Sequence, residues 1–215
     1  MANATRLMQI QQYTQQQLQQ ATPDHDFAHA QRVAKMAVQI QQHDFVQLDP
    51  ELLQTTAYVH DLIDDKVVTD PLKAQQKLQQ QLQKLHFSPP QINEIFDIIT
   101  HLSFSKNLQQ HYHLSPIGKV VQDADRLDAL GAIGIARAFY YGGKRNEPLY
   151  NPDIKPRQLK NKAEYRQTGT VINHFYEKLF QLPEQMNTVY AQKLAQERVN
   201  LMHQFVDQFK ADWSL

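Results

Sequence analysis

The chain has 215 residues, 41% of them hydrophobic and 20% charged, with no cysteine, so disulfides, thiolate nucleophiles and cysteine-based zinc sites are excluded. The 22 basic and 22 acidic residues cancel, and we therefore expect neither a nucleic-acid polymer nor a membrane as a partner. Residues 1–20 are polar and rich in glutamine, and no run approaches the roughly 18 apolar residues of a membrane span. We expect a cytoplasmic protein.

The apolar residues recur mainly at intervals of three and four, which predicts an all-α fold. Asp49-Pro50 and Pro89-Pro90 are typical helix openings, and Gly142-Gly143 is a typical helix end. The predicted helices cover about residues 3–20, 27–43, 50–63, 71–86, 90–101, 117–141, 161–182 and 186–213.

The longest irregular segment, about residues 142–160, separates the last two predicted helices from the rest. Long loops in compact domains are often functional. This segment is either a substrate lid or an ordinary solvated loop, and we favour the solvated loop. Its cationic residues are Lys144, Arg145, Lys155, Arg157 and Lys160.

Charged residues interrupt two of the most apolar predicted helices. His60-Asp61 follows Ala57-Tyr58-Val59, and the acidic residues of 123–128 lie between Val120-Val121 and an apolar run from Leu127. Burying an ionised carboxylate without a partner costs several kcal/mol. A divalent cation would compensate both sets of charges.

Imidazole and carboxylate ligands suit one ion of Mn, Fe, Co, Ni or Zn, and carboxylates also suit Mg. His60 and Asp61 need further ligands from other elements, and His29 and Asp125 are the natural donors. A lone His-Asp pair is weak evidence, because the chain has three of them. We interpret His43-Asp44 as a solvated helix end, and His25-Asp26 as either a helix cap or a support for the metal site.

The pattern His29, His60-Asp61, Asp125 resembles the His…His-Asp…Asp metal signature of the HD superfamily. Longer segments resemble the small bacterial single-domain HD hydrolases, a group that includes the YpgQ-like nucleotide pyrophosphohydrolases. These segments are His25–Val33, His60–Lys66, Ser103–Ser105, Gln122–Gly134 and His174–Leu179. The resemblance implies a single all-helical HD domain over residues 1–215, with a metal-binding core at about 22–135 and additional C-terminal helices at about 161–213. It also implies hydrolysis of a phosphoester or phosphoanhydride bond.

We expect a metal-dependent phosphohydrolase acting on a nucleotide. Asp64, with Asp65 as the second candidate, would activate the water, because Asp64 follows His60 by one helical turn. Cations are needed to bind the phosphates, although each cation suits a surface salt bridge at least as well. The candidates are Arg32, Lys66 and Arg126, with Lys178 from the matched segment His174–Leu179.

Three alternatives stay open. We favour one metal ion, but His101 lies where two-metal HD proteins carry extra histidines; His111 and His113, in the same interval, are expected to be exposed. The chain could instead be a nucleotide-binding or regulatory HD protein without turnover. The apolar faces of the last two helices could serve a homodimer.

Overall fold

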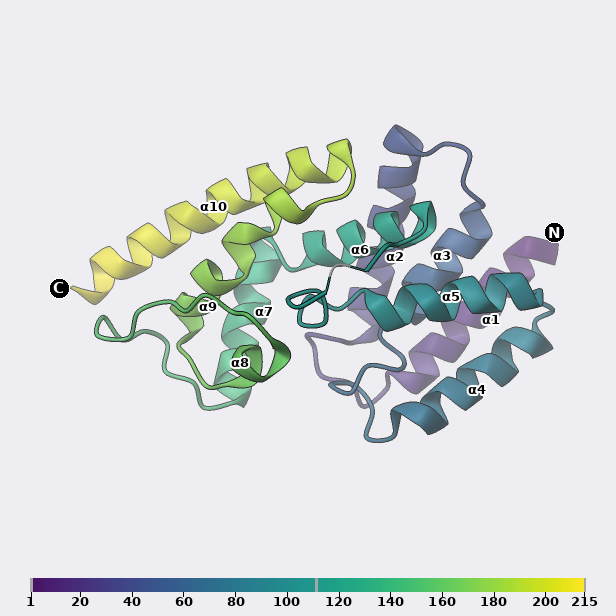
Figure 1. Cartoon of the computed structure of the whole chain (residues 1–215), viewed down its shortest axis with the longest axis horizontal. Coiled ribbons are helices and arrows are strands. Elements are labelled where there is room, and N and C mark those ends of the chain that lie inside the picture. Colours follow the sequence, from purple (N-terminus) through teal and green to yellow (C-terminus); the bar gives the residue numbers. More distant parts are fainter. Residues whose placement is uncertain (1, 111, 215) are drawn as a thin grey trace. The chain divides into compact units, whose positions relative to one another are not determined.

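The computed structural model describes residues 2–110 and 112–214, and within them every regular element is a helix (Figure 1). The all-α prediction is confirmed. No helix in these ranges combines the length and apolar character needed to cross a membrane. The helices are α1 (Ala2–Gln17), α2 (Phe27–Asp44), α3 (Pro50–Val59), α4 (Pro71–Lys84), α5 (Pro89–His101), α6 (Pro116–Asp128), α7 (Gly131–Lys144), α8 (Lys162–Arg166), α9 (Val171–Glu177), η1 (Leu179–Gln181), η2 (Pro183–Gln185) and α10 (Val189–Trp213).

The chain divides into two compact units, the first ending at Ala124 and the second beginning at Asp125. The boundary falls within α6. The organisation of residues 1–215 as a single HD domain therefore stays a prediction.

In the first unit, α3 packs between α1 and α2, and these contacts place the start of α2 beside the end of α3. Asp26 begins α2 by accepting a hydrogen bond from the His29 amide, and Asp49 begins α3 by accepting from two amides. The core residues of α2, α3 and α5 are apolar and almost fully buried: Val33, Ala37, Ile40, Leu53, Ala57, Ile95 and Ile98. This packing fixes the backbone that carries the histidines.

The helix predicted over residues 50–63 ends early, at Val59, and tight turns follow it. His60 Nδ1 lies 2.7 Å from the Ala57 carbonyl oxygen. In a continued α-helix that oxygen would accept from the Asp61 amide. The side chain therefore competes with the helix for its acceptor, and His60-Asp61 lies in the turn that ends α3 rather than inside the helix.

The helix predicted over residues 117–141 is two helices, α6 and α7, and α7 continues through Gly142-Gly143 to Lys144. α6 ends at Asp128, and α7 begins at Gly131, whose φ of +72° is readily adopted only by glycine. A Cβ on Gly142 would lie 2.3 Å from Val171 Cγ2, so this glycine permits close packing within α7 rather than ending the helix.

The second unit has an aromatic core around Phe175, which is fully buried and stacks on Phe205. The prediction of one helix over residues 161–182 is also wrong, because this range contains the separate helices α8, α9 and η1. Gln167 is extended, and the Thr170 side chain accepts from the Asn173 amide to begin a new helix, α9. The long helix α10 begins in the same way, with the Thr188 side chain accepting from the Ala191 amide.

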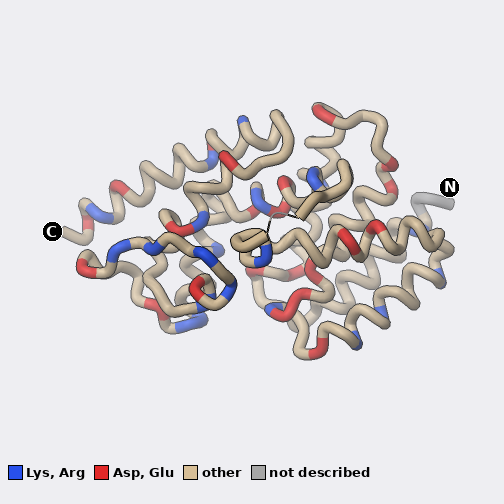
Figure 2. The backbone as a smooth tube through the Cα atoms, viewed as in Figure 1, with Lys and Arg blue, Asp and Glu red and all other residues tan. Residues whose placement is uncertain are grey.

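The segment predicted as a loop, residues 142–160, carries both basic and acidic residues, as Figure 2 shows. The Arg157 guanidinium donates to both carboxylate oxygens of Glu177 at 2.7 and 2.8 Å, and Arg145 donates to Glu147 at 2.9 Å. Lys144, Lys155 and Lys160 are exposed. The two arginines hold the segment in place, and its interpretation as an ordinary solvated loop stays a prediction.

Replacing Arg157 with methionine is expected to lower the free energy of unfolding by about 2–3 kcal/mol. Breaking a fully buried ion pair costs about 3–5 kcal/mol, but the Arg157 side chain is 31% exposed while Glu177 is 4% exposed. Urea denaturation measures the change. The control is Arg145→Met, whose more exposed pair is worth at most about 1 kcal/mol. Equal losses in the two variants would contradict the structural role of Arg157.

Candidate metal centre

His29 lies in the first turn of α2, where its backbone is fixed by the cap. The Asp26 side chain accepts from the His29 amide at 2.8 Å, and the residue is 1% exposed. Its ring faces the His60 ring edge to face, with the centroids 5.1 Å apart. Buried imidazoles need polar partners, and His29 finds them in the turn after α3.

His60 is 4% exposed and has one ring nitrogen committed to the backbone. The carbonyl oxygen of Ala57 can only accept, so Nδ1–H of His60 donates to it over 2.7 Å. In the neutral ring this leaves an unprotonated Nε2 lone pair. Metal-binding histidines are usually oriented in this way by a second hydrogen bond.

Three ligand atoms converge at the end of α3. His29 Nε2 and His60 Nε2 are 3.2 Å apart, and Asp61 Oδ2 is 3.4 Å from each of them. An ion with bonds of about 2.0–2.2 Å separates neighbouring ligand atoms by about 2.8–3.6 Å in tetrahedral or octahedral geometry. The three atoms therefore fit one face of such a site.

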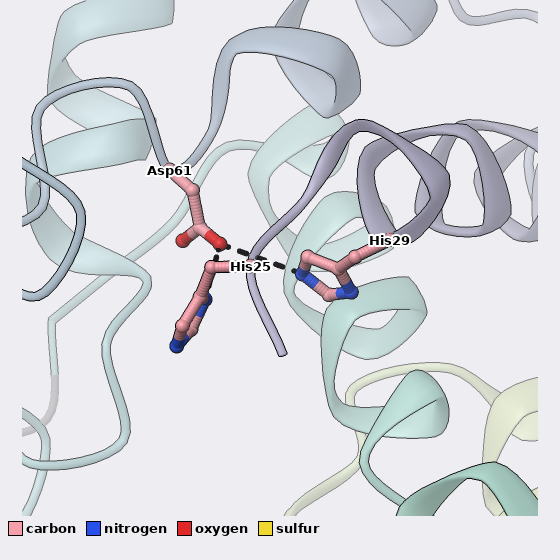
Figure 3. Close-up of side chains that lie close together, drawn as sticks. All are labelled: His25, His29 and Asp61. Carbon is pink, nitrogen blue, oxygen red and sulfur yellow. Dashed lines mark hydrogen bonds and ion pairs between the residues drawn. The ribbon is translucent and has the colours of Figure 1, made fainter. Parts of the chain in front are cut away.

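Asp61 is held as an anion. Burial raises the pKa of the Asp61 carboxyl, but the charges of His60 and His25 and hydrogen bonds from His25 and His29 outweigh it, so that the pKa lies well below its usual range. Figure 3 shows the carboxylate directed toward His25 and His29. An ionised carboxylate beside two imidazoles is a ligand set that Mn, Fe, Co, Ni and Zn accept.

The carboxylates that follow are part of a turn. Asp64 is half-buried, and its Oδ1 accepts from the Lys66 amide at 2.9 Å. Asp65 and Lys66 are exposed, and Arg32 is half-buried on α2, one turn after His29. Because residues 60–64 are not α-helical, the spacing argument that directed Asp64 toward His60 was wrong. Its catalytic role stays a prediction.

The remaining predicted site residues, Asp125, Arg126 and Lys178, belong to the second unit. Arg126 is buried and donates to the Gln185 carbonyl oxygen, and Lys178 contacts the Tyr165 hydroxyl at 3.5 Å. Asp128 is paired with Arg137 at 2.8 Å. An arginine, rather than a metal, therefore compensates this acidic residue of α6.

The other histidines differ in exposure and in the residues that they contact. Asp26 of the pair His25-Asp26 is the cap of α2, and the His25 ring contacts Asp61 at 2.7 Å, so the helix-cap interpretation is confirmed and the support of a metal site stays a prediction. His43 is exposed at the end of α2, as predicted, and so is His113, whereas His111 lies outside the described residues. His101 Nδ1 donates to the Asp97 carbonyl oxygen at 2.8 Å, and the ring stacks on Tyr112.

Comparison with known proteins defines the class. A model of the HD domain matches residues 26–130, and YpgQ of Bacillus subtilis is 36% identical over 205 residues, which are 95% of this chain and 92% of YpgQ. The chain belongs to the HD superfamily.

Solved structures agree with this assignment. A Lactobacillus plantarum protein is 45% identical, with a TM-score of 0.88 over 98% of this chain and 97% of that one. YpgQ in complex with ADP is 35% identical, with a TM-score of 0.78 over 99% and 97%. An HD-superfamily hydrolase from Bacillus thuringiensis is 32% identical, with a TM-score of 0.75 over 99% and 98%.

Proposed function

We propose that the chain is a metal-dependent phosphohydrolase that acts on a nucleotide. The observation that carries this proposal is the triangle of His29 Nε2, His60 Nε2 and Asp61 Oδ2, whose sides of 3.2, 3.4 and 3.4 Å fit a divalent ion. Asp125 is proposed as the fourth ligand because it completes the superfamily's His…His-Asp…Asp pattern. The nucleotide is supported by the YpgQ structure, which was solved with ADP.

A bound divalent ion would lower the pKa of a water ligand and polarise a phosphoryl oxygen. The protein then has to position that water and receive its proton, which is the role we propose for Asp64, with Asp65 as the alternative. Arg32 and Lys66 of the first unit, with Arg126 and Lys178 of the second, are proposed to bind the phosphates. Arg126 is the weakest of these four candidates for phosphate binding, because its guanidinium already donates to the Gln185 carbonyl oxygen.

The proposal is tested by incubating the full chain with nucleoside mono-, di- and triphosphates and added Mn²⁺, Mg²⁺, Co²⁺ or Ni²⁺. We expect metal-dependent release of phosphate or pyrophosphate from at least one nucleotide, and loss of that release when a chelator is added. Separate assays for orthophosphate and pyrophosphate identify the bond that is cleaved.

Binding of a nucleotide without turnover under any of these conditions would contradict the proposal. It would instead support an HD protein that binds a nucleotide in a regulatory role. Isothermal titration calorimetry with the same nucleotides and a chelator-treated protein measures this binding.

A further inference from the structure

His25 makes the shortest hydrogen bond to the metal-site carboxylate. Its Nδ1 lies 2.7 Å from Asp61 Oδ2, the oxygen that faces His29 (Figure 3). The same oxygen is 3.4 Å from His60 Nε2. An ionised carboxylate can only accept, so His25 Nδ1–H is the donor. Two atoms that share one ion lie about 2.8–3.6 Å apart. His25, His29 and Asp61 are close enough to hold an ion together, but the 2.7 Å separation is also that of a charge-assisted hydrogen bond. The ligand count described below separates the two.

The segment that carries His25 is fixed on both sides of it. Asp26 accepts from the His29 amide at 2.8 Å, and Asp24, which is 6% exposed, has its Oδ2 3.7 Å from His25 Nε2. The His25 side chain is itself 18% exposed and meets the His29 ring edge to face. In residues 24–26, Asp26 therefore fixes the backbone of His29, and His25, itself next to Asp24, fixes the carboxylate of Asp61.

We propose that His25 is a positioning residue for the metal centre, where it donates to Asp61 and fixes the carboxylate toward the point between the two Nε2 atoms. The proposal rests on the function proposed above, because it requires that Asp61 binds a metal. Partners that orient a metal ligand typically raise metal affinity by about 10- to 100-fold. His25 acts through Asp61 and does not bind the ion.

The test compares Mn²⁺ affinity, measured by isothermal titration calorimetry, for the chelator-treated full chain and three variants. His25→Leu removes the donor and is expected to weaken binding by about 10- to 100-fold. In His25→Asn the amide nitrogen takes the place of Nδ1, so affinity should stay close to that of the unchanged chain. His43→Leu is the matched control, because His43 is an exposed histidine that is also followed by aspartate, and it should leave affinity unchanged.

Equal affinity in His25→Leu and the unchanged chain would overturn the proposal. So would equally weak binding in His25→Leu and His25→Asn, because it would show that the imidazole itself is required. Thermal melts of the metal-free proteins check folding. If His25→Leu does not fold, His25→Gln, whose amide lies at the Nε2 position, replaces it with the same expected loss.

A spectroscopic count of ligands separates positioning from direct binding. Electron spin-echo modulation of bound Mn²⁺ should report two imidazole nitrogens in both the unchanged chain and His25→Asn. Three nitrogens in the unchanged chain and two in the variant would overturn the proposal. Failure of the unchanged chain to bind Mn²⁺ would remove the metal site and the proposed function together, whereas an unaffected His25→Leu would remove only this inference.

Discussion

Replacing Asp61 with alanine is expected to remove both Mn²⁺ binding and phosphohydrolase activity. The substitution deletes the one anion in the triangle with His29 and His60, whose sides are 3.2 to 3.4 Å. Loss of a ligand should exceed the roughly 100-fold that loss of a ligand's hydrogen-bond partner can cost. Because a catalytic metal supplies several kcal/mol of transition-state stabilisation, kcat/KM should fall by at least about 10³-fold.

The matched control for Asp61→Ala is Asp44→Ala. Asp44 also follows a histidine, His43, and it also lies at a helix end, the last residue of α2. Calorimetry with Mn²⁺ and a steady-state assay on the cleaved nucleotide measure both variants. Tight Mn²⁺ binding and full activity in Asp61→Ala would exclude this carboxylate from the metal centre.

Replacing Asp64 with asparagine is expected to separate catalysis from metal binding. The asparagine side-chain oxygen can still accept from the Lys66 amide, as Asp64 Oδ1 does at 2.9 Å, so the turn should be preserved. The amide cannot accept a proton from water. General-base catalysis contributes about 10²- to 10⁴-fold, and kcat should fall by that factor while Mn²⁺ affinity stays the same.

Asp65→Asn is the comparison for Asp64→Asn, because Asp65 is the adjacent and more exposed carboxylate. It should keep most of the activity. The reverse result, a large loss in Asp65→Asn with little change in Asp64→Asn, would assign the base to Asp65. Unchanged kcat in both variants would exclude a carboxylate of this turn as the base.

The sequence predicted helix starts better than helix ends. The predicted range 27–43 agrees closely with α2 (Phe27–Asp44), and Pro71 and Pro89 begin α4 and α5 as expected. Capping residues and prolines act locally, so their effect is visible in the residues themselves. The helix ends depend on features that the spacing of apolar residues does not show. One is the hydrogen bond from the His60 side chain to the Ala57 carbonyl oxygen, and another is the positive φ of Gly131.

Part of the candidate site could be predicted for a physical reason. His60 and Asp61 stood out because charged groups in an apolar segment need compensation, and the structure brings them together with His29. The sequence distinguished His43-Asp44, at the predicted end of a helix, from His25-Asp26, before the predicted start of the same helix, but left the second pair open between a helix cap and a support for the metal site. The packing of α2 against α3 supplies what the sequence could not, because it brings the His25 ring to Asp61.

One divalent ion is expected to bind between His29, His60 and Asp61. Anomalous X-ray scattering from a crystal of the full chain grown with Mn²⁺ tests it most directly. We predict a single strong peak about 2.0–2.3 Å from His29 Nε2, His60 Nε2 and Asp61 Oδ2. A saturated crystal without a peak there, with the two imidazoles hydrogen-bonded to each other instead, would contradict the account.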